Sequence, residues 1–229
     1  MFKKTLITLL AAHSLASAST AQAGSTNKTP PPQPSPPPIP ISSLPFVISA
    51  PGTYVLTGNL SYSDTTNTAA IKIQTDIQGT VTVDLKGFTL TGNAGSSIAI
   101  GIGYFAGSSV PNSFPIIIQN GTINNFGYGV EAGIDAIHSV TQLSISKLNI
   151  NTTATSYEAG IILDSASFST INNCSFNGGS YGIEDLQSPG GNSYANNTFK
   201  NTAPIVVSGQ NGGVPTVLNS CSFNGPPIN

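Results

Sequence analysis

The chain has 229 residues, of which only 7% are charged, and it contains nine acidic residues, seven lysines and no arginine. So few basic residues provide no basic patch, which argues against nucleic acid as a partner. Hydrophobic residues make up 38% of the chain. They recur in register, which favours an ordered domain over the charged, weakly hydrophobic composition that is typical of disorder.

The first 23 residues have the features of a signal peptide. Two lysines precede an apolar run from Leu6 to Leu15, and Ala21-Gln22-Ala23 follows before Gly24. This order predicts cleavage before Gly24 and a secreted or cell-envelope location. An N-terminal membrane anchor is the alternative, but the run is short and His13 interrupts it. No second long apolar run follows, so we expect no transmembrane anchor.

Residues 24–43 are rich in Pro, Ser and Thr and include two triple-proline runs. Such a stretch favours extended polyproline structure, which predicts a disordered, semi-rigid linker. Residues 44–229 then form one domain. After the signal peptide the chain has five lysines against nine acidic residues, a net charge of −4.

A repeat of 23 to 33 residues runs through this domain. Each copy has a last apolar position, here called the anchor, and the anchors are Leu90, Ile123, Ile150, Phe176, Phe199 and Phe223. Five residues before each anchor stand Leu85, Ile118, Ile145, Ile171, Tyr194 and Leu218. Two residues before it stand Phe88, Gly121, Leu148, Cys174, Asn197 and Cys221.

Polar positions are equally regular. The residue before each anchor is small and polar, namely Thr89, Thr122, Asn149, Ser175, Thr198 and Ser222. The residue after it is Asn in four copies, and we expect a corner there, because Asn tolerates left-handed backbone. A third apolar run is headed by Ile71, Ile98, Val130, Ile161, Ile183 and Ile205.

Alternation of apolar and polar residues at period two predicts strands with one buried face. Each repeat contains three such strands and three corners, and stacked repeats form a solenoid of parallel sheets. The sequence therefore predicts an all-β, right-handed parallel β-helix of about six or seven turns, most simply a monomer. A β-sandwich also has short strands and turns, but column-wise similarity at one period argues against it.

These columns resemble the right-handed parallel β-helix of the pectate-lyase-like superfamily. The Asn column is similar to the asparagine ladder of that fold, and Phe46–Leu60 resembles the first turn of its secreted members. The resemblance covers about Leu44 to Gly225. It is specific for the fold, whereas one fold hosts many functions.

The resemblance implies that polysaccharide lyase and glycoside hydrolase activity must be considered. Lyases of this fold bind calcium through an acidic cluster and use Arg or Lys as a base, and this chain has no arginine. The hydrolase motifs Asn-Thr-Asp, Asp-Asp and Gly-His-Gly are absent as well. We therefore expect no cofactor, with calcium only if the protein is a lyase.

The weak catalytic candidates are Asp164, Glu184, Asp185 and Glu131. Alignment of the third apolar run places Glu131 and Glu184 in one outward column, with one strand between them, roughly 9–10 Å apart. That separation is near the upper end for an inverting hydrolase. Asp185 falls in a column that is otherwise apolar. A carboxylate that faces a core needs a partner or a shifted pKa, which is a weak sign of function. The simpler interpretation is that the strand ends at Glu184 and that Asp185 turns outward.

Two function classes remain open. The first is an exported module with no evident catalytic site, a surface or extracellular protein that contacts polysaccharide through the flat, uncharged row before the anchors. That row is also compatible with a merely solvated sheet face. The second is a carbohydrate-active enzyme, a polysaccharide lyase or glycoside hydrolase, with an acidic site near Asp164, Glu184 and Asp185.

The two cysteines, Cys174 and Cys221, occupy one inward column two turns apart. Two strand spacings are about 9.6 Å, whereas a disulfide needs Cα atoms within about 7 Å. The sequence thus predicts two reduced, buried thiols. One further feature is a long step between repeats, which predicts a loop within Ile102–Pro115 that lies on a binding face, or else caps a groove or fills a gap.

Overall fold

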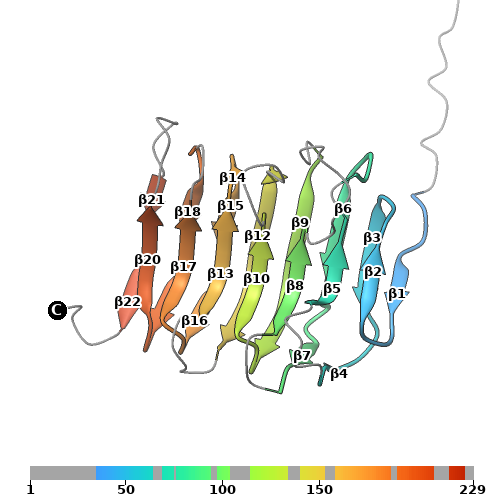
Figure 1. The fold of residues 1–229 in the computed structure, drawn as a ribbon, viewed down its shortest axis with the longest axis horizontal. Helices are drawn as coiled ribbons and strands as arrows, with labels where there is room; N and C mark the ends of the chain where they lie inside the picture. Colours follow the sequence, from blue (N-terminus) through green and yellow to red (C-terminus); the bar gives the residue numbers. More distant parts are fainter. Residues whose placement is uncertain are drawn as a thin grey trace, which may run out of the picture. The chain divides into compact units, whose positions relative to one another are not determined.

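The computed structural model describes residues 35–63, 69–74, 76–93, 97–103, 114–133, 140–152, 158–186, 190–208 and 217–224. Every regular element in these ranges is a β-strand, and the strands pair in parallel. None of these residues forms a helix with the length and apolarity that a membrane crossing requires. Residues 36–229 form one compact unit, a β-solenoid of about five turns (Figure 1).

The larger sheet has 13 strands in two adjoining rows, which merge in the long strands β9 and β12. One row contains β1 (Ile39–Ile41), β3 (Gly52–Leu56), β6 (Val81–Asp84), β9 (Ile116–Asn124), β12 (Leu143–Asn151), β15 (Thr170–Asn172), β18 (Ser193–Ala195) and β21 (Val217–Asn219). The other row adds β4 (Leu60–Ser61), β7 (Thr89–Thr91), β16 (Ser175–Asn177), β19 (Thr198–Lys200) and β22 (Ser222–Asn224).

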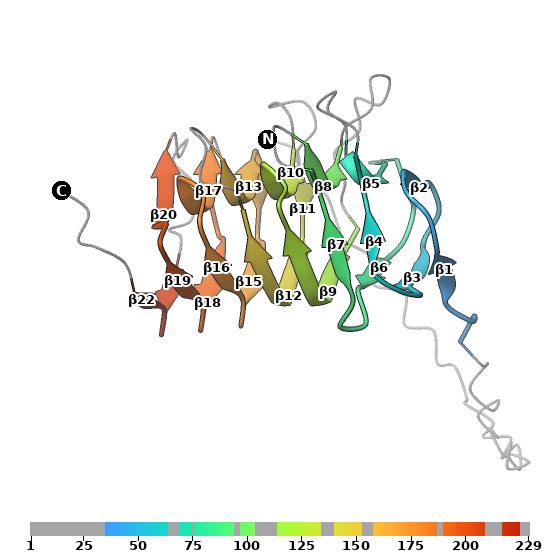
Figure 2. The ribbon, with the colours of Figure 1, turned by 90° about the horizontal axis from the view of Figure 1, so that it is seen from below.

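A second sheet of seven strands lies against the first (Figure 2). It contains β2 (Phe46–Ile48), β5 (Ala69–Ile73), β8 (Ile98–Ile102), β10 (Tyr128–Ala132), β13 (Ala159–Asp164), β17 (Tyr181–Leu186) and β20 (Ala203–Ser208). A short two-stranded sheet pairs β11 (Val140–Thr141) with β14 (Ala166–Ser167). The strand β1 lies within residues that the sequence assigned to the linker.

The anchor column is confirmed residue by residue. Neighbouring paired strands align Leu60, Leu90, Ile123, Ile150, Phe176, Phe199 and Phe223 in one column. The column five residues earlier is in register from Ile118 to Leu218. Because neighbouring strands are about 4.8 Å apart, equivalent residues form rows that cross the strands from turn to turn. The structure has about five turns, fewer than the six or seven that the sequence predicts.

One predicted column is wrong at its first member. Val83, and not Leu85, aligns with Ile118. The corner after β6 is two residues longer than the later corners, and Leu85 lies inside it, fully buried. Its side chain fills the space at Gly121, where an added Cβ would collide with it. Leu85 therefore takes the inward place that the sequence assigned to Phe88.

Asp84 holds this longer corner in place. Its carboxylate accepts hydrogen bonds from the backbone N–H of Lys86 (2.8 Å) and from the side-chain amides of Asn120 and Gln119 (3.3 Å each). Lys86 Nζ also lies 3.5 Å from it. Burial raises the pKa of Asp84, but these hydrogen bonds and the Lys86 charge outweigh burial, so the pKa is lowered overall.

The third run contains a similar shift of two residues. Ile100, and not Ile98, aligns with Ile71 and Val130. The column that continues to Asp185 accordingly contains Ile102 in place of Ile100. Both residues are fully buried, so the core composition is unaffected.

An asparagine ladder follows the anchors, although the predicted reason for it is wrong. The amide of Asn151 donates to Asn124 Oδ1 (2.7 Å), that of Asn177 to Asn151 Oδ1 (3.4 Å), and that of Asn201 to Asn177 Oδ1 (3.1 Å). The first three are strand residues and not left-handed corners. Their role is to join successive turns through side-chain amides.

Left-handed backbone occurs two residues after three of the anchors, at Asn125, Gly178 and Asn201, one residue later than predicted, and it also occurs three residues before the anchors. This corner column is Asn120, Lys147, Asn173, Asn196 and Ser220, with φ between 51° and 60°. Asn tolerates this conformation better than most residues, which explains its frequency here. The corner column turns the chain from one row of the larger sheet into the other.

Aromatic rings fill the interior near the C-terminal end. The rings of Phe176 and Phe199 stack with centroids 5.0 Å apart, and Phe223 stacks on Phe199 at 5.5 Å. Each of the first two rings lies over a glycine of the seven-stranded sheet, Gly160 and Gly182, where an added Cβ would collide with the ring. These glycines are needed for close approach.

Candidate functional site

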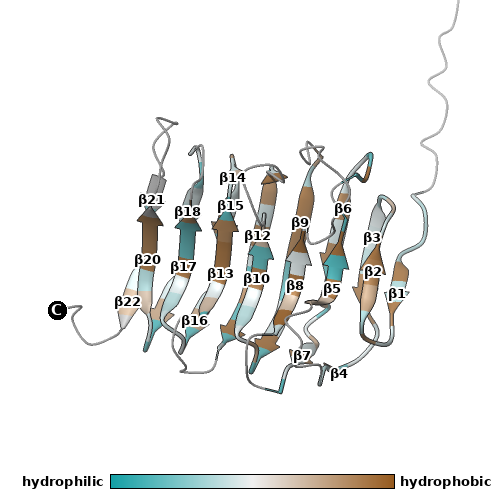
Figure 3. Cartoon of the chain, in the orientation of Figure 1, coloured by the Kyte–Doolittle hydropathy of each residue, from teal (hydrophilic) through white to brown (hydrophobic). Residues whose placement is uncertain are grey.

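The seven-stranded sheet brings three of the four predicted acids to its outer face. Glu131 on β10 aligns with Ile162 on β13, and Ile162 aligns with Glu184 on β17, as predicted. Asp164 lies two residues beyond Ile162 on the same face. In Figure 3 the strands β10 and β17 are teal near their ends, and the apolar β13 lies between them.

Glu131 and Asp164 form an electrostatically coupled pair. The pKa of Glu131 is raised to about 7, mainly by burial and in addition by the nearby charge of Asp164. Burial also raises the pKa of Glu184. A carboxyl group with a pKa near neutrality can donate or accept a proton. Among the described residues, no three or more His, Cys, Asp or Glu side chains form a group that could hold a metal ion.

Asp185 does not belong to this face, and the expectation that it turns outward is wrong. The strand β17 continues to Leu186, so Asp185 points inward and is 0% exposed. Its Oδ2 accepts hydrogen bonds from the hydroxyl of Tyr194 (2.6 Å) and the amide of Asn192 (3.1 Å). A fully buried carboxylate cannot contact a polymeric substrate, so we assign Asp185 a structural role.

The interior network around Asp185 connects two successive turns. Asn192 also donates to the carbonyl of Ala166 (3.1 Å) and accepts from the N–H of Ser169 (2.9 Å). Burial and the charge of Asp185 raise the pKa of Tyr194, so its hydroxyl remains a donor. Asp185 Oδ1 has no hydrogen-bond partner in the described residues, which makes the network sensitive to the loss of either donor.

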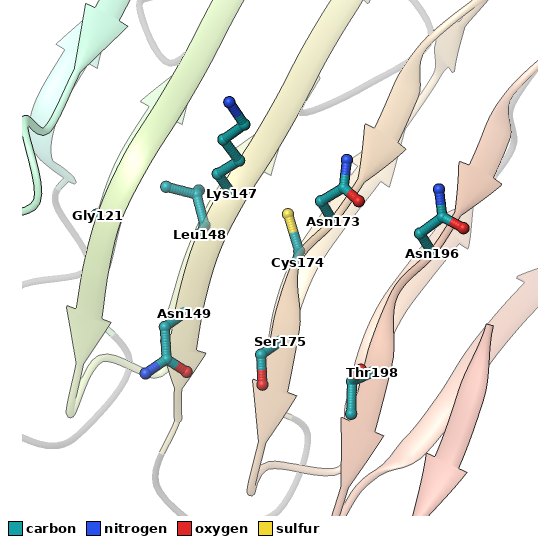
Figure 4. Close-up of a pocket in the computed structure, with 9 residues that line it drawn as sticks. All are labelled: Gly121, Lys147, Leu148, Asn149, Asn173, Cys174, Ser175, Asn196 and Thr198. Carbon is teal, nitrogen blue, oxygen red and sulfur yellow. The ribbon is translucent and has the colours of Figure 1, made fainter. Parts of the chain in front are cut away.

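A groove lies on the outer face of the larger sheet, at the corner column. Its volume is about 440 Å³, and it is lined by Gly121, Lys147, Leu148, Asn149, Asn173, Cys174, Ser175, Asn196 and Thr198. Figure 4 shows these residues on adjacent strands, in rows that repeat from one turn to the next. We call it the corner groove.

Three parallel rows make up the corner groove. Lys147, Asn173 and Asn196 belong to the left-handed corner column. The row before the anchors contributes Asn149, Ser175 and Thr198, which are aligned by strand pairing. The bend at the corner places these two outward rows on either side of an inward-pointing floor, and this produces the hollow.

The floor of the corner groove is held by a buried amide. Asn197, 0% exposed, donates to the carbonyl of Ile171 (2.9 Å) and accepts from the N–H of Cys174 (2.9 Å). These bonds fix one corner against the next. The groove is therefore preformed by backbone geometry and does not depend on loops.

The chemistry of the corner groove is that of binding. Its lining offers amides, hydroxyls and one ammonium group, and it includes no carboxylate. Burial raises the pKa of the Cys174 thiol to about 11, so it stays protonated and is a poor nucleophile at neutral pH. Both cysteines are free, as predicted, although Cys221 is only partly buried.

Sequence reasoning found one row of this groove and missed the other. The row before the anchors was recognised as flat and uncharged, but the corner column was treated only as a set of turns. The sequence feature that could have revealed this second row is the Asn that recurs at positions 120, 173 and 196. The predicted loop within Ile102–Pro115 lies largely outside the described residues.

No protein-family model matches this chain, and neither a curated protein nor a solved structure matches it. The fold and the site therefore define the class of protein directly. It is a parallel β-solenoid with a preformed polar corner groove, whose lining holds one lysine and no carboxylate, and with a separate acidic face.

Proposed function

We propose that this protein is an exported, non-catalytic module that binds polysaccharide in the corner groove. The observation that carries the proposal is the groove itself: amides and hydroxyls on consecutive turns form its walls. Repeated neutral donors and acceptors match the repeated hydroxyls of an extended glycan. The resemblance to the pectate-lyase-like superfamily agrees with a glycan ligand, and the signal-peptide pattern of residues 1–23 agrees with export.

The spacing of the groove residues supports an extended ligand. Successive turns repeat about every 4.8 Å, so a chain that crosses the strands meets the same kind of side chain at each step. Lys147 is the single cation in the lining. A neutral polysaccharide, or one that has few acidic groups, fits this charge better than a densely charged polymer.

Direct binding measurements test this proposal. Isothermal titration of the purified protein with a panel of soluble polysaccharides should identify at least one ligand. The triple change Asn149→Ala, Ser175→Ala and Thr198→Ala removes polar groups from one wall, and it should weaken binding at least tenfold, since each lost hydrogen bond costs about 0.5–1.5 kcal/mol.

The matched control lies in the same row. Thr122 occupies the position equivalent to Asn149 on the preceding turn, and it does not line the groove. The change Thr122→Ala should therefore leave the affinity unchanged. Equal effects of the triple variant and of Thr122→Ala would place the binding site elsewhere.

A second candidate function is a carbohydrate-active enzyme with its site on the acidic face. The specific observation in its favour is the pKa of Glu131, about 7, beside Asp164. An incubation with and without calcium tests it: new reducing ends indicate a hydrolase, and absorbance of an unsaturated product indicates a lyase. Glu131→Gln should then abolish activity without loss of folding.

A further inference from the structure

Phe168 is an exposed aromatic residue in an unusual backbone conformation. Its side chain is 60% exposed, the highest value among the exposed large hydrophobic residues of the described chain. Its φ is 52°, in the left-handed region. Bulky residues are rare in that region, and such outliers cluster at functional positions.

The left-handed conformation is imposed by a second corner column. Strand pairing aligns Thr141 with Ser167, and Ser167 with Gly190. The next residue of each turn is Gln142, Phe168 or Gly191, with φ of 61°, 52° and 77°. The corner can accept glycine, as the third turn shows. An aromatic residue is thus not required there for the backbone to turn.

The ring of Phe168 is supported by the next turn. It lies on Gly191, where an added Cβ would be 2.8 Å from Phe168 Cδ1 and 2.9 Å from Cε1. Glycine at that position leaves room for the ring to lie close to the backbone of the next turn. One side of the ring is therefore covered by protein, and the exposed part faces away from Gly191.

The neighbouring sheet surface is polar and uncharged. Beyond Phe168 the chain enters β15, whose outward residues Thr170 and Asn172 are partly exposed. Thr170 lies between Ser144 and Ser193 of the adjacent strands. The strand ends at Asn172, and the next residue, Asn173, lies in the corner groove, about 16 Å along the chain from Phe168 at about 3.3 Å per residue.

This combination matches the two kinds of surface on a sugar ring. A pyranose has an apolar face of C–H groups, which carry a slight positive charge and pack against the negative face of an aromatic ring. Its hydroxyls point outward and need hydrogen-bonding partners. Phe168 can receive the C–H face, and the hydroxyl and amide side chains beside it can bond the rim.

We propose that Phe168 is a stacking platform for a pyranose ring of the same glycan that occupies the corner groove, with the polymer crossing the strands within the groove and continuing from Asn173 along the outer face of β15. This inference rests on the proposed function and extends it. A ligand of several sugar units is needed to reach from Phe168 to Asn173. A second copy of the protein is the competing occupant, and the test separates the two.

The decisive variant is Phe168→Gly. Glycine suits the left-handed backbone, so this change should leave the melting temperature unchanged or raise it while removing the ring. Affinity for the bound polysaccharide, measured by isothermal titration, should fall at least tenfold, and Phe168→Tyr should retain it. Phe168→Asn, which also tolerates left-handed backbone, provides a second variant if the glycine variant folds poorly.

A control variant and three contrary outcomes complete the test of Phe168. Phe223, 55% exposed, provides a matched aromatic, and Phe223→Ala should keep the affinity. If the wild type binds polysaccharide and Phe168→Gly binds equally well, the platform is disproved while the proposed function stands. If Phe168→Gly changes only the dimer content in light scattering, the residue contacts another copy. If no polysaccharide binds the wild type, both proposals fail.

Discussion

The ring of Phe199 occupies the space over Gly182, where any side chain would collide with it. The two residues come from facing sheets, so this contact sets how closely the sheets approach. Replacing Gly182 with Ala should destabilise the protein by about 1–3 kcal/mol, because overpacking forces the ring or the backbone to move. Urea denaturation measures the change.

A matched glycine provides the control for this prediction. Gly58 has no atom within 4 Å of an added Cβ, so Gly58→Ala should be close to neutral. Similar losses of stability in both variants would show that Gly182 is not a close-approach position.

The rings of the aromatic stack should contribute unequally to the free energy of unfolding. Phe199 lies between Phe176 and Phe223 and is 1% exposed, whereas Phe223 is 55% exposed. Phe199→Ala should cost about 3–5 kcal/mol of unfolding free energy. Phe223→Ala should cost clearly less, since it loses less buried area. Thermal or urea unfolding decides this, and a loss below about 1 kcal/mol for Phe199→Ala would contradict a core role.

The hydroxyl of Tyr194 should contribute to stability through Asp185. Tyr194→Phe removes the 2.6 Å hydrogen bond to a fully buried carboxylate, and it should cost about 1–3 kcal/mol. Tyr54→Phe is the comparison, because that hydroxyl bonds the backbone carbonyl of Ala50. Denaturation should rank Tyr194→Phe as the more damaging change. The reverse order would mean that Asp185 does not depend on this donor.

The repeat predicted the anchor column because its residues recur with similar neighbours on every turn. The shifts at Leu85 and Ile98 could not be detected in the same way. A slip of two residues keeps every side chain on its original face of a strand, so the apolar pattern is the same before and after the slip. At Leu85, the length of the corner after Asp84 distinguishes the two registers.

Asp185 illustrates a different limit. An isolated carboxylate in a core is costly, which made an outward position the simpler expectation. Its partners, Asn192 and Tyr194, come from the next turn, and only the fold shows that they meet it. The sequence does place Asn192 and Tyr194 two residues apart before a corner, so both side chains point inward, and Tyr194 stands in a column that is otherwise aliphatic. Two inward polar groups need an interior partner.

Stability should depend on pH through Glu131. Its pKa is about 7 in the folded protein, compared with about 4.3 in an unfolded chain. Between these values the folded state holds a proton that the unfolded state has lost, so stability should fall as pH rises from about 4.3 to 7. Below about pH 4.3, Glu131 is protonated in both the folded and the unfolded state, so its ionisation no longer lowers the stability.

Glu131→Gln tests this prediction directly. The amide cannot ionise, so the variant should lose this pH dependence and be more stable than the wild type at pH 8. Unfolding measured at several pH values gives the comparison. A parallel pH profile in wild type and variant would mean that Glu131 titrates normally.

The most direct test of the account is to measure the length of a polysaccharide before and after it has been bound. The protein is mixed with a ligand identified by titration, with and without calcium, and the polymer is then sized by gel filtration while reducing ends and unsaturated products are assayed. We predict that the polymer is bound and its length is unchanged. Shortened chains with new ends of either kind, lost in the Glu131→Gln variant, would contradict a non-catalytic module.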